Sequence, residues 1–414
     1  MATATVLALV ARQLAPAGFG QLNFATTLIA IGASFANLGL EGIVIGELIR
    51  RPGREGAVLG TAFRLRLAAG LASAALLAGG AILTRGLHHE ARVIAVVALG
   101  LVFQPAEVVD LWFQRHLDSR RTAVARFVAV LTGATLKLWL VACGAPLVAF
   151  AWALAADYAL FALALGCANW RSPHSSGPWV WDAEIARTLW LRGAPLALAG
   201  ACVVFSLRLD QLLVRTWLGE SAAGIYFAAT RLTDIALFTG ATMTLSLFPA
   251  LATTHRQSDD AYRLRLQAMF DALSALGWLV AIGGTFAGPW VIKLLYGPAY
   301  AGAASVLAVQ GWTCLFALNG SVRGQFILLS GPTLLNVATA MVNILVLLAL
   351  GWWLVPALGP TGAALAALGA GLVSNYGTTL LFPLLRPCAR AQSRGLLILF
   401  TPDRWPGLLQ QFRS

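Results

Sequence analysis

The stretch VFSLRLDQLLVRTWLG, from Val204 to Gly219, lies inside an apolar run that is long enough to cross a lipid bilayer. It nevertheless carries three charged residues, Arg208, Asp210 and Arg215. A charge at the centre of a bilayer costs roughly 2.5–3.5 kcal/mol on insertion scales, so such residues usually bind, couple or pair with something. What these three charges do depends on the rest of the chain.

The composition of the chain indicates a polytopic membrane protein. Of its 414 residues, 59% are hydrophobic and only 11% are charged, and the mean hydropathy is +0.77. A soluble domain has about a quarter of its residues charged. The net charge of +12 does not indicate a nucleic-acid partner, because the arginines are spread over short loops and form no basic domain.

Apolar runs set the expected number of membrane crossings, since one crossing needs about 20 apolar residues. Eleven such runs occur, at roughly 21–48, 60–84, 92–113, 123–143, 146–168, 189–214, 224–250, 268–292, 303–329, 332–355 and 361–385. The preceding segment MATATVLALVA is too short to span and lacks the features of a signal peptide. We interpret it as the outer half of a truncated first helix, so the sequence predicts an all-α membrane protein of about twelve helices.

The distribution of Lys and Arg predicts the orientation of the helices. If the segment IRRPGREG is cytoplasmic, that side receives twenty of the 29 Lys and Arg residues, Arg64 and Arg66 among them. Both termini are then cytoplasmic. The five Cys and five His have no paired or metal-ligand spacing, so we expect no cofactor.

Two short echoes indicate an internal repeat. RQLAPAGFGQLNFATT begins at Arg12 and RTWLGESAAGIYFAAT at Arg215, and FRLRL from Phe63 returns as YRLRL from Tyr262. Both pairs are six helices apart, which preserves orientation and predicts two parallel six-helix lobes. The expected divisions are an N-terminal lobe over 1–168, a cytoplasmic linker over 169–188, a C-terminal lobe over 189–385 and an interfacial tail over 386–414.

Several motifs are similar to those of a known family. ARQLAPAGFG resembles the A-R-x-L-G-P-x-x-Y-G signature of O-antigen and oligosaccharide flippases, and LDQLLVRTWLGESAAGIYFAATRL resembles their helix 7–8 junction. LFPAL, KLLYGPAYAGAASVL and LVPALGPTGAALA match later landmarks in the same order. The family belongs to the multidrug/oligosaccharidyl-lipid/polysaccharide exporter superfamily. The resemblance implies twelve helices in two lobes, alternating access, and a polyprenyl-diphosphate-linked oligosaccharide as substrate.

Charged and amide side chains inside the apolar runs are the candidate site residues. For contact with the substrate these are Arg12, Lys137, Arg208, Arg215, Arg231, Arg323, Asn336 and Asn343. For ion coupling or helix pairing they are Glu107, Asp110, Asp157, Asp210 and Asp234. Arginine suits a diphosphate because its planar fork binds two oxygens at once. A proton or a sodium ion is the candidate coupling ion.

Several of these residues have an alternative role that the sequence leaves open. Arg208 and Asp210 differ by about 200° around a helix, so only one of them can face a given cavity. We assign Arg208 to a cavity and Asp210 to a contact with a neighbouring helix, with a purely structural role for both as the alternative. Glu107 and Asp110 either relay ions or pair with Lys137 or another cation.

Further candidate residues carry the same ambiguity. Asp157 either couples or pairs with Lys137, and Arg231 has Asp234 three residues on as a local partner. Arg323 can reach the cytoplasmic surface by snorkelling. For Arg12 and Arg215 the alternative is anchoring at the membrane interface. Asn336, Thr339 and Asn343 form a polar stripe that bonds either to a neighbouring helix or to substrate.

The first hypothesis is therefore a flippase that moves a lipid-linked O-antigen or exopolysaccharide repeat unit across a bacterial inner membrane, without covalent chemistry. Its partners would be the bilayer, this lipid-linked substrate, a polysaccharide polymerase and glycosyltransferases. A cation-coupled drug exporter is the second hypothesis. A membrane glycosyltransferase or O-antigen polymerase is the third, although the outer loops are short and no D-x-D motif occurs.

Overall fold

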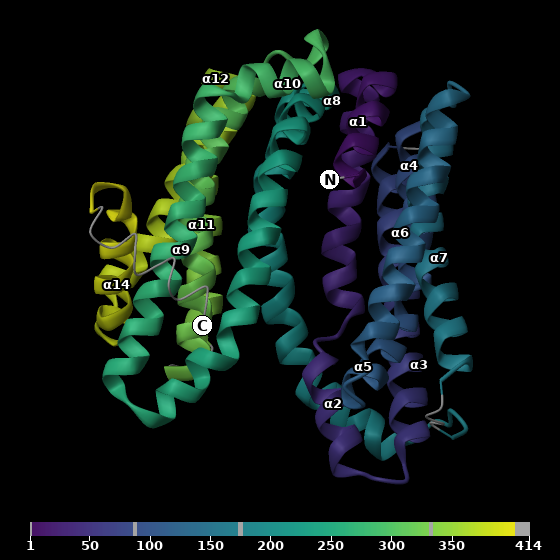
Figure 1. The fold of residues 1–414 in the computed structure, drawn as a ribbon. Helices are drawn as coiled ribbons and strands as arrows, with labels where there is room; N and C mark the ends of the chain where they lie inside the picture. The colour runs from purple at the N-terminus through teal and green to yellow at the C-terminus, as the bar shows by residue number, and fades with distance from the viewer. Residues whose placement is uncertain (1, 86–88, 173–176, 331–333, 402–414) are drawn as a thin grey trace. The chain divides into compact units, whose positions relative to one another are not determined.

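The computed structural model describes residues 2–85, 89–172, 177–330 and 334–401, and in these segments the chain is helical and contains no strand (Figure 1). The expected all-α fold class is confirmed. The chain divides into two compact units, residues 1–208 and residues 209–414, and each is described by itself. The lobe and linker boundaries expected from the sequence stay a prediction, because this division reports packing and not which segments move together.

The first unit is a bundle in which α3, α4, α6 and α7 run side by side (Figure 1). Its helices are α1 (Ala2–Ala36), α2 (Glu41–Arg50), α3 (Glu55–Arg85), α4 (His89–Ala98), α5 (Val108–Arg115), α6 (Ser119–Ala142), α7 (Leu147–Trp170) and the first part of α8 (Ala183–Gln257). Between α4 and α5 the backbone narrows into 3₁₀ turns over Leu99–Val102 and Gln104–Glu107. Pro105 explains part of this change, since it has no N–H to continue an α-helix.

The second unit includes α9 and α11, which pack closely against each other. Its helices are the rest of α8, α9 (Asp259–Phe286), α10 (Gly288–Tyr296), α11 (Ala303–Ser330), α12 (Leu334–Leu372), α13 (Thr378–Leu381) and α14 (Arg386–Leu396). A π-helical turn over Val373–Gly377 joins α12 to α13. Phe270, Leu318 and Val322 are among the buried side chains of its core.

Among the residues described, nine helices are long and apolar enough to cross a membrane, judged by length and composition. The helices over Thr5–Arg50, Ala183–Thr254 and Leu334–Leu381 have 46, 72 and 48 residues, at least twice the roughly 20 that a crossing needs. Each contains a residue with non-helical backbone angles at which the helix breaks. In Ala183–Thr254 and Leu334–Leu381 the arms on both sides of the break are long enough to cross, whereas in Thr5–Arg50 the arm before Ala15 is too short to span.

The three breaks share one backbone conformation, with positive φ and extended ψ. Ala15 has φ 54° and ψ 173°, Gly219 has φ 85° and ψ −169°, and Gly359 has φ 61° and ψ −141°. Pro16 and Pro360 follow two of them and start the next helix, where a missing N–H costs nothing. Glycine adopts such angles without strain, but alanine does not. Ala15 stands where the flippase signature has glycine.

Candidate functional site

Asp210, one of the three charges in the opening stretch, is held by a buried hydrogen-bond network in the second unit. The hydroxyl of Tyr226 donates to Asp210 Oδ2 at 2.5 Å, and Gln310 Nε2 donates to the same hydroxyl at 2.6 Å. Thr233 in turn donates to Gln310 Oε1 at 3.4 Å. Tyr226 is fully buried. The network links both arms of the broken helix α8 to α11, so it supports a helix-pairing role for Asp210, with a tyrosine as partner.

The other two charges of that stretch have different surroundings. Arg215 is buried and forms an ion pair with Glu220 at 2.9 Å, across the break at Gly219. This pair fixes the turn and supports a structural role for Arg215. Arg208 is half-buried, at the end of the first unit. Its assignment to a cavity stays a prediction.

Four more of the expected charges form two ion pairs, each inside its own unit. Lys137 on α6 pairs with Asp157 on α7, and Arg231 pairs with Asp234 at 3.6 Å on α8. Gly133 permits the first contact, because a Cβ atom there would lie 2.1 Å from Asp157 Oδ1. These geometries favour the pairing roles of the four residues.

Arg323 does not snorkel to the surface as expected, because its side chain is only 4% exposed. Its guanidinium donates to the carbonyl of Ser374, to Thr378 Oγ1 at 3.0 Å and to Thr339 Oγ1 at 3.2 Å. Ser374 lies in the π-helical turn, where a carbonyl misses its usual helical partner. The side chain therefore ties α11 to α12 and stabilises the irregular turn that follows α12.

The polar stripe on α12 points toward this same region. Asn343 Nδ2 donates to Ser374 Oγ at 3.0 Å, and Thr339 accepts the bond from Arg323. Asn336, one turn earlier, is half-buried, and its carbonyl accepts a bond from Thr339 Oγ1 at 2.9 Å. Bonds between elements thus account for Thr339 and Asn343.

Arg66 is a buried charge that the sequence analysis did not include among the candidate site residues. Its side chain is 2% exposed in the interior of the first unit, whereas Arg64, two residues earlier, is exposed. Its Nε and Nη2 have no hydrogen-bond partner among the described residues. Residues two apart point to nearly opposite sides of a helix. That spacing alone could have shown that the pair cannot share one environment.

The acidic residues of the α4–α5 segment lie near Arg66. The charges of Glu107 and Glu41 both act on its guanidinium, and that of Arg126 acts on Glu107. Asp110 accepts a hydrogen bond from Gln114 Nε2 at 3.0 Å. Glu107 ends the 3₁₀ stretch, and such stretches often mark hinges.

Sequence analysis also missed Asp271 of α9 in the second unit, which is 6% exposed and accepts a hydrogen bond from Gln267 Nε2 at 2.7 Å.

Asp182 caps the start of α8 outside the membrane-crossing segments. Its Oδ1 accepts the backbone N–H of Ile185 at 3.0 Å and that of Glu184 at 2.9 Å, and its other oxygen pairs with Arg54. The N–H of Ile185 is the main reason why the pKa of Asp182 lies below its usual value, and Arg54 adds to the effect. The cap fixes the end of the expected linker against α3, where Thr61 Oγ1 accepts the N–H of Asp182 at 3.0 Å.

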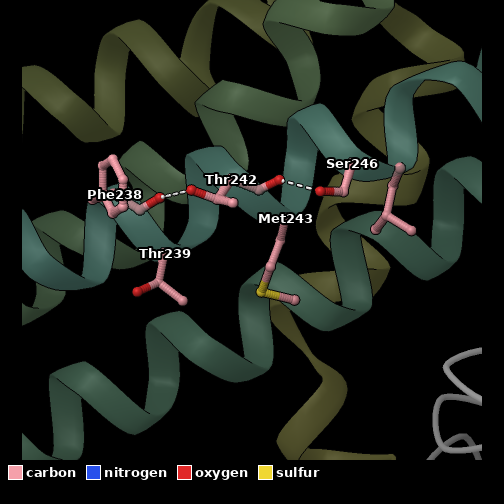
Figure 2. A pocket seen from close by; sticks show the side chains of 6 residues that line it. Phe238, Thr239, Thr242, Met243 and Ser246 are labelled. Atoms are coloured by element: carbon pink, nitrogen blue, oxygen red, sulfur yellow. Dashed lines mark hydrogen bonds between the residues drawn. The ribbon is translucent and has the colours of Figure 1, made fainter. Parts of the chain in front are cut away.

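A hollow of about 440 Å³ lies along one face of α8 in the second unit, lined by Phe238, Thr239, Thr242, Met243, Ser246 and Leu247 (Figure 2). Figure 2 shows that Thr242 and Ser246 donate to carbonyls of their own helix, at 2.9 Å each. The hollow therefore offers an apolar lining. A second hollow, of about 370 Å³, is lined in the first unit by residues of α1, α2 and α8, with Glu41 as its only ionisable residue.

Comparison with solved structures defines the class of fold. An inward-facing multidrug resistance MATE family transporter of the MOP superfamily has a TM-score of 0.75 at 13% identity, covering 97% of this chain and 96% of that one. The lipid II flippase MurJ, in an inward closed conformation, has a TM-score of 0.71 at 12% identity, covering 96% and 90%. A MOP superfamily transporter from Pyrococcus furiosus follows at 0.62 and 13%, covering 96% and 95%. The chain thus has the fold of a MOP transporter and is a multi-pass membrane protein.

The family is shown by the sequence itself. The family described as polysaccharide biosynthesis protein matches residues 9–305, and the chain belongs to it. No curated protein matches the chain. The resemblance noted from the motifs is confirmed for family and fold.

Proposed function

We propose that this protein is a flippase that moves a polyprenyl-diphosphate-linked oligosaccharide from the cytoplasmic to the outer leaflet of a bacterial inner membrane. The observation that carries the proposal is the family match over residues 9–305, in a chain that has a transporter fold along nearly its whole length. The full-length likeness to a lipid II flippase is compatible with a lipid-linked substrate. Transport by alternating access needs no covalent step, so we do not assign catalytic residues.

Arg208 is the residue to which we assign the head group of the substrate. An apolar pathway would force a diphosphate and a hydrated glycan to shed water at great cost. Arg208 is half-buried on a membrane-crossing helix, so its guanidinium lies at the depth where a head group would need shelter from the bilayer. The guanidinium stays charged inside a membrane protein and offers a fork that matches phosphate oxygens.

The test expresses Arg208 variants in cells whose own flippase has been deleted. The measured quantity is the amount of surface polymer that the cells export. Arg208→Ala should abolish export, and Arg208→Lys should weaken it, because lysine has no fork. Loss of one charge-assisted contact costs roughly 1.5–3 kcal/mol, or about 10–150-fold in affinity. Arg120→Ala is the control, since Arg120 is exposed at the start of α6. Normal export by Arg208→Ala at unchanged protein abundance in the membrane would remove Arg208 from the site.

A cation-coupled drug exporter is the second candidate. The apolar lining of the α8 hollow, whose hydroxyls are bonded within their own helix, would suit an uncharged or lipophilic ligand. Drug susceptibility measured in the same cells separates the two. Resistance that depends on this chain, with no effect on polymer export, would favour the drug exporter.

The remaining parts of the proposal concern the setting of transport. We infer that both termini are cytoplasmic, that a proton or a sodium ion provides the coupling, and that a polymerase and glycosyltransferases act with the protein. The Arg distribution supports the orientation. The acidic cluster of Glu107 and Asp110 is the first place to test for coupling, with export measured at different proton and sodium gradients.

A further inference from the structure

The exposed side of α14 carries a row of three arginines. Arg386, Arg390 and Arg394 are spaced four residues apart, which places them along one side of the helix, and all three are exposed. The opposite side is buried, with Cys388 and Gln392 fully enclosed. We call the row of Arg386, Arg390 and Arg394 the arginine face.

The helix α14 packs along a membrane-crossing helix and is not a free tail. Gln267 Nε2 of α9 donates to the carbonyl of Ala391 at 3.1 Å, and Trp278 Nε1 donates to that of Leu396 at 2.9 Å. The crossing over Asp260–Phe286 has 27 residues, about 40 Å of helix, which matches a hydrocarbon core with its headgroup layers. Gln267 lies about 10 Å from its start. The arginine face therefore begins at the depth of the lipid headgroups.

Within the part of the chain that the structure describes, no acidic side chain pairs with the arginine face. Residues 382–401 contain no Asp or Glu, and none of the described carboxylates forms an ion pair with the three arginines. Beyond Arg394, Leu397 and Phe400 are exposed by 54% and 70%. A cationic row that ends in exposed apolar side chains matches the two parts of a phospholipid, an anionic phosphate and its acyl chains.

We propose that the arginine face binds the phosphate groups of anionic phospholipids in the adjacent leaflet, with their acyl chains against Leu397 and Phe400. Charge complementarity and depth both favour a lipid of the bilayer as the occupant. Arginine binds phosphate oxygens with two donors at once, and long basic side chains near helix ends reach toward the headgroups. The orientation predicted from the Lys and Arg distribution makes this the cytoplasmic leaflet.

The experiment measures lipid retention by the full chain, purified in a mild detergent, by native mass spectrometry. Phosphatidylglycerol and phosphatidylcholine are added separately, and undecaprenyl phosphate is a third ligand. The variants are Arg386→Gln/Arg390→Gln/Arg394→Gln, the same triple change to Lys, and Arg120→Gln as a matched control on α6. Each basic residue near a membrane surface contributes about fivefold in affinity, so the triple Gln variant should lose about 100-fold.

We expect the unaltered protein to retain phosphatidylglycerol over phosphatidylcholine. The triple Gln variant should lose this preference, and the triple Lys variant should keep part of it. Unchanged retention in the triple Gln variant, or equal loss in Arg120→Gln, would overturn the proposal. Selective retention of undecaprenyl phosphate alone would also overturn it, in favour of a substrate-docking role. If the triple variant elutes as an aggregate, the single variant Arg390→Gln replaces it in the test. Its affinity for phosphatidylglycerol should fall about fivefold. The result is independent of whether the chain is a flippase.

Discussion

Replacing Ala15 with glycine should stabilise this protein, although most alanine-to-glycine changes in helical proteins destabilise them. Ala15 has φ 54° and ψ 173°, a combination that only glycine adopts without strain and that costs another residue of order 1–3 kcal/mol. Glycine loses about 0.5–1 kcal/mol more backbone entropy on folding, so the net gain should be about 1 kcal/mol. Ala15 is exposed, and little packing is lost with its methyl group. For a unit of this size, that gain raises Tm by about 2–4 °C.

The assay is thermal unfolding of the purified protein in one detergent, at one scan rate, with two control variants. Gly219→Ala places an alanine at the corresponding break of α8, where φ is 85° and a Cβ would touch nothing within 4 Å. Its cost of order 1–3 kcal/mol would therefore be purely conformational. Ala72→Gly, at an exposed helical position of α3, should cost about 0.5–1 kcal/mol. If Ala15→Gly lowers Tm as Ala72→Gly does, the backbone strain inferred at Ala15 is absent and the argument fails.

Two other substitutions test the hydrogen-bond networks. Tyr226→Phe removes the hydroxyl that joins Asp210 to Gln310, and it should lower the free energy of unfolding by about 1–3 kcal/mol. Asp210→Asn keeps an acceptor and should cost less; equal Tm values for Tyr226→Phe and wild type would contradict the network. Asp182→Ala should reduce hydrogen-exchange protection of the Ile185 amide at neutral pH. Because the pKa of Asp182 is lowered, its contribution is present at neutral pH and lost as the pH falls through that pKa, so the difference should disappear in strongly acidic buffer. A difference of the same size there would refute the role of the ionised carboxylate.

The sequence predicted the helices well because hydrophobic length is a local property. The turn at Ala15 is also a local signal, since proline disfavours a helical conformation in the residue before it. Partners of buried charges are not local. Nothing in the neighbourhood of Asp210 indicates Gln310, because α11 lies about a hundred residues further along the chain. Tyr226 is only 16 residues away, but it lies on the other arm of α8, beyond the break at Gly219. Only the packed bundle brings these side chains together.

Arg66 illustrates a different limit, because the signal was present and the rule applied to it was too coarse. Counting basic residues near helix ends assigns a whole segment to one side of the membrane, but it does not distinguish two arginines two positions apart on α3. The helical period does, since it turns Arg64 outward when Arg66 faces the bundle. A buried guanidinium with unpaired N–H groups is costly, and the nearby carboxylates of Glu107 and Glu41 offset part of that cost.

The three charges of the opening stretch can now be weighed against their cost in the membrane. Asp210 gains a buried tyrosine, and Arg215 gains Glu220 across the break. Both bonds offset part of the insertion penalty of roughly 2.5–3.5 kcal/mol per charge, and both hold the turn of α8 in one shape. Arg208 is the charge of the stretch that we assign to transport, because its planar fork matches the oxygens of a diphosphate. Its replacement is therefore the most direct test of the proposed substrate.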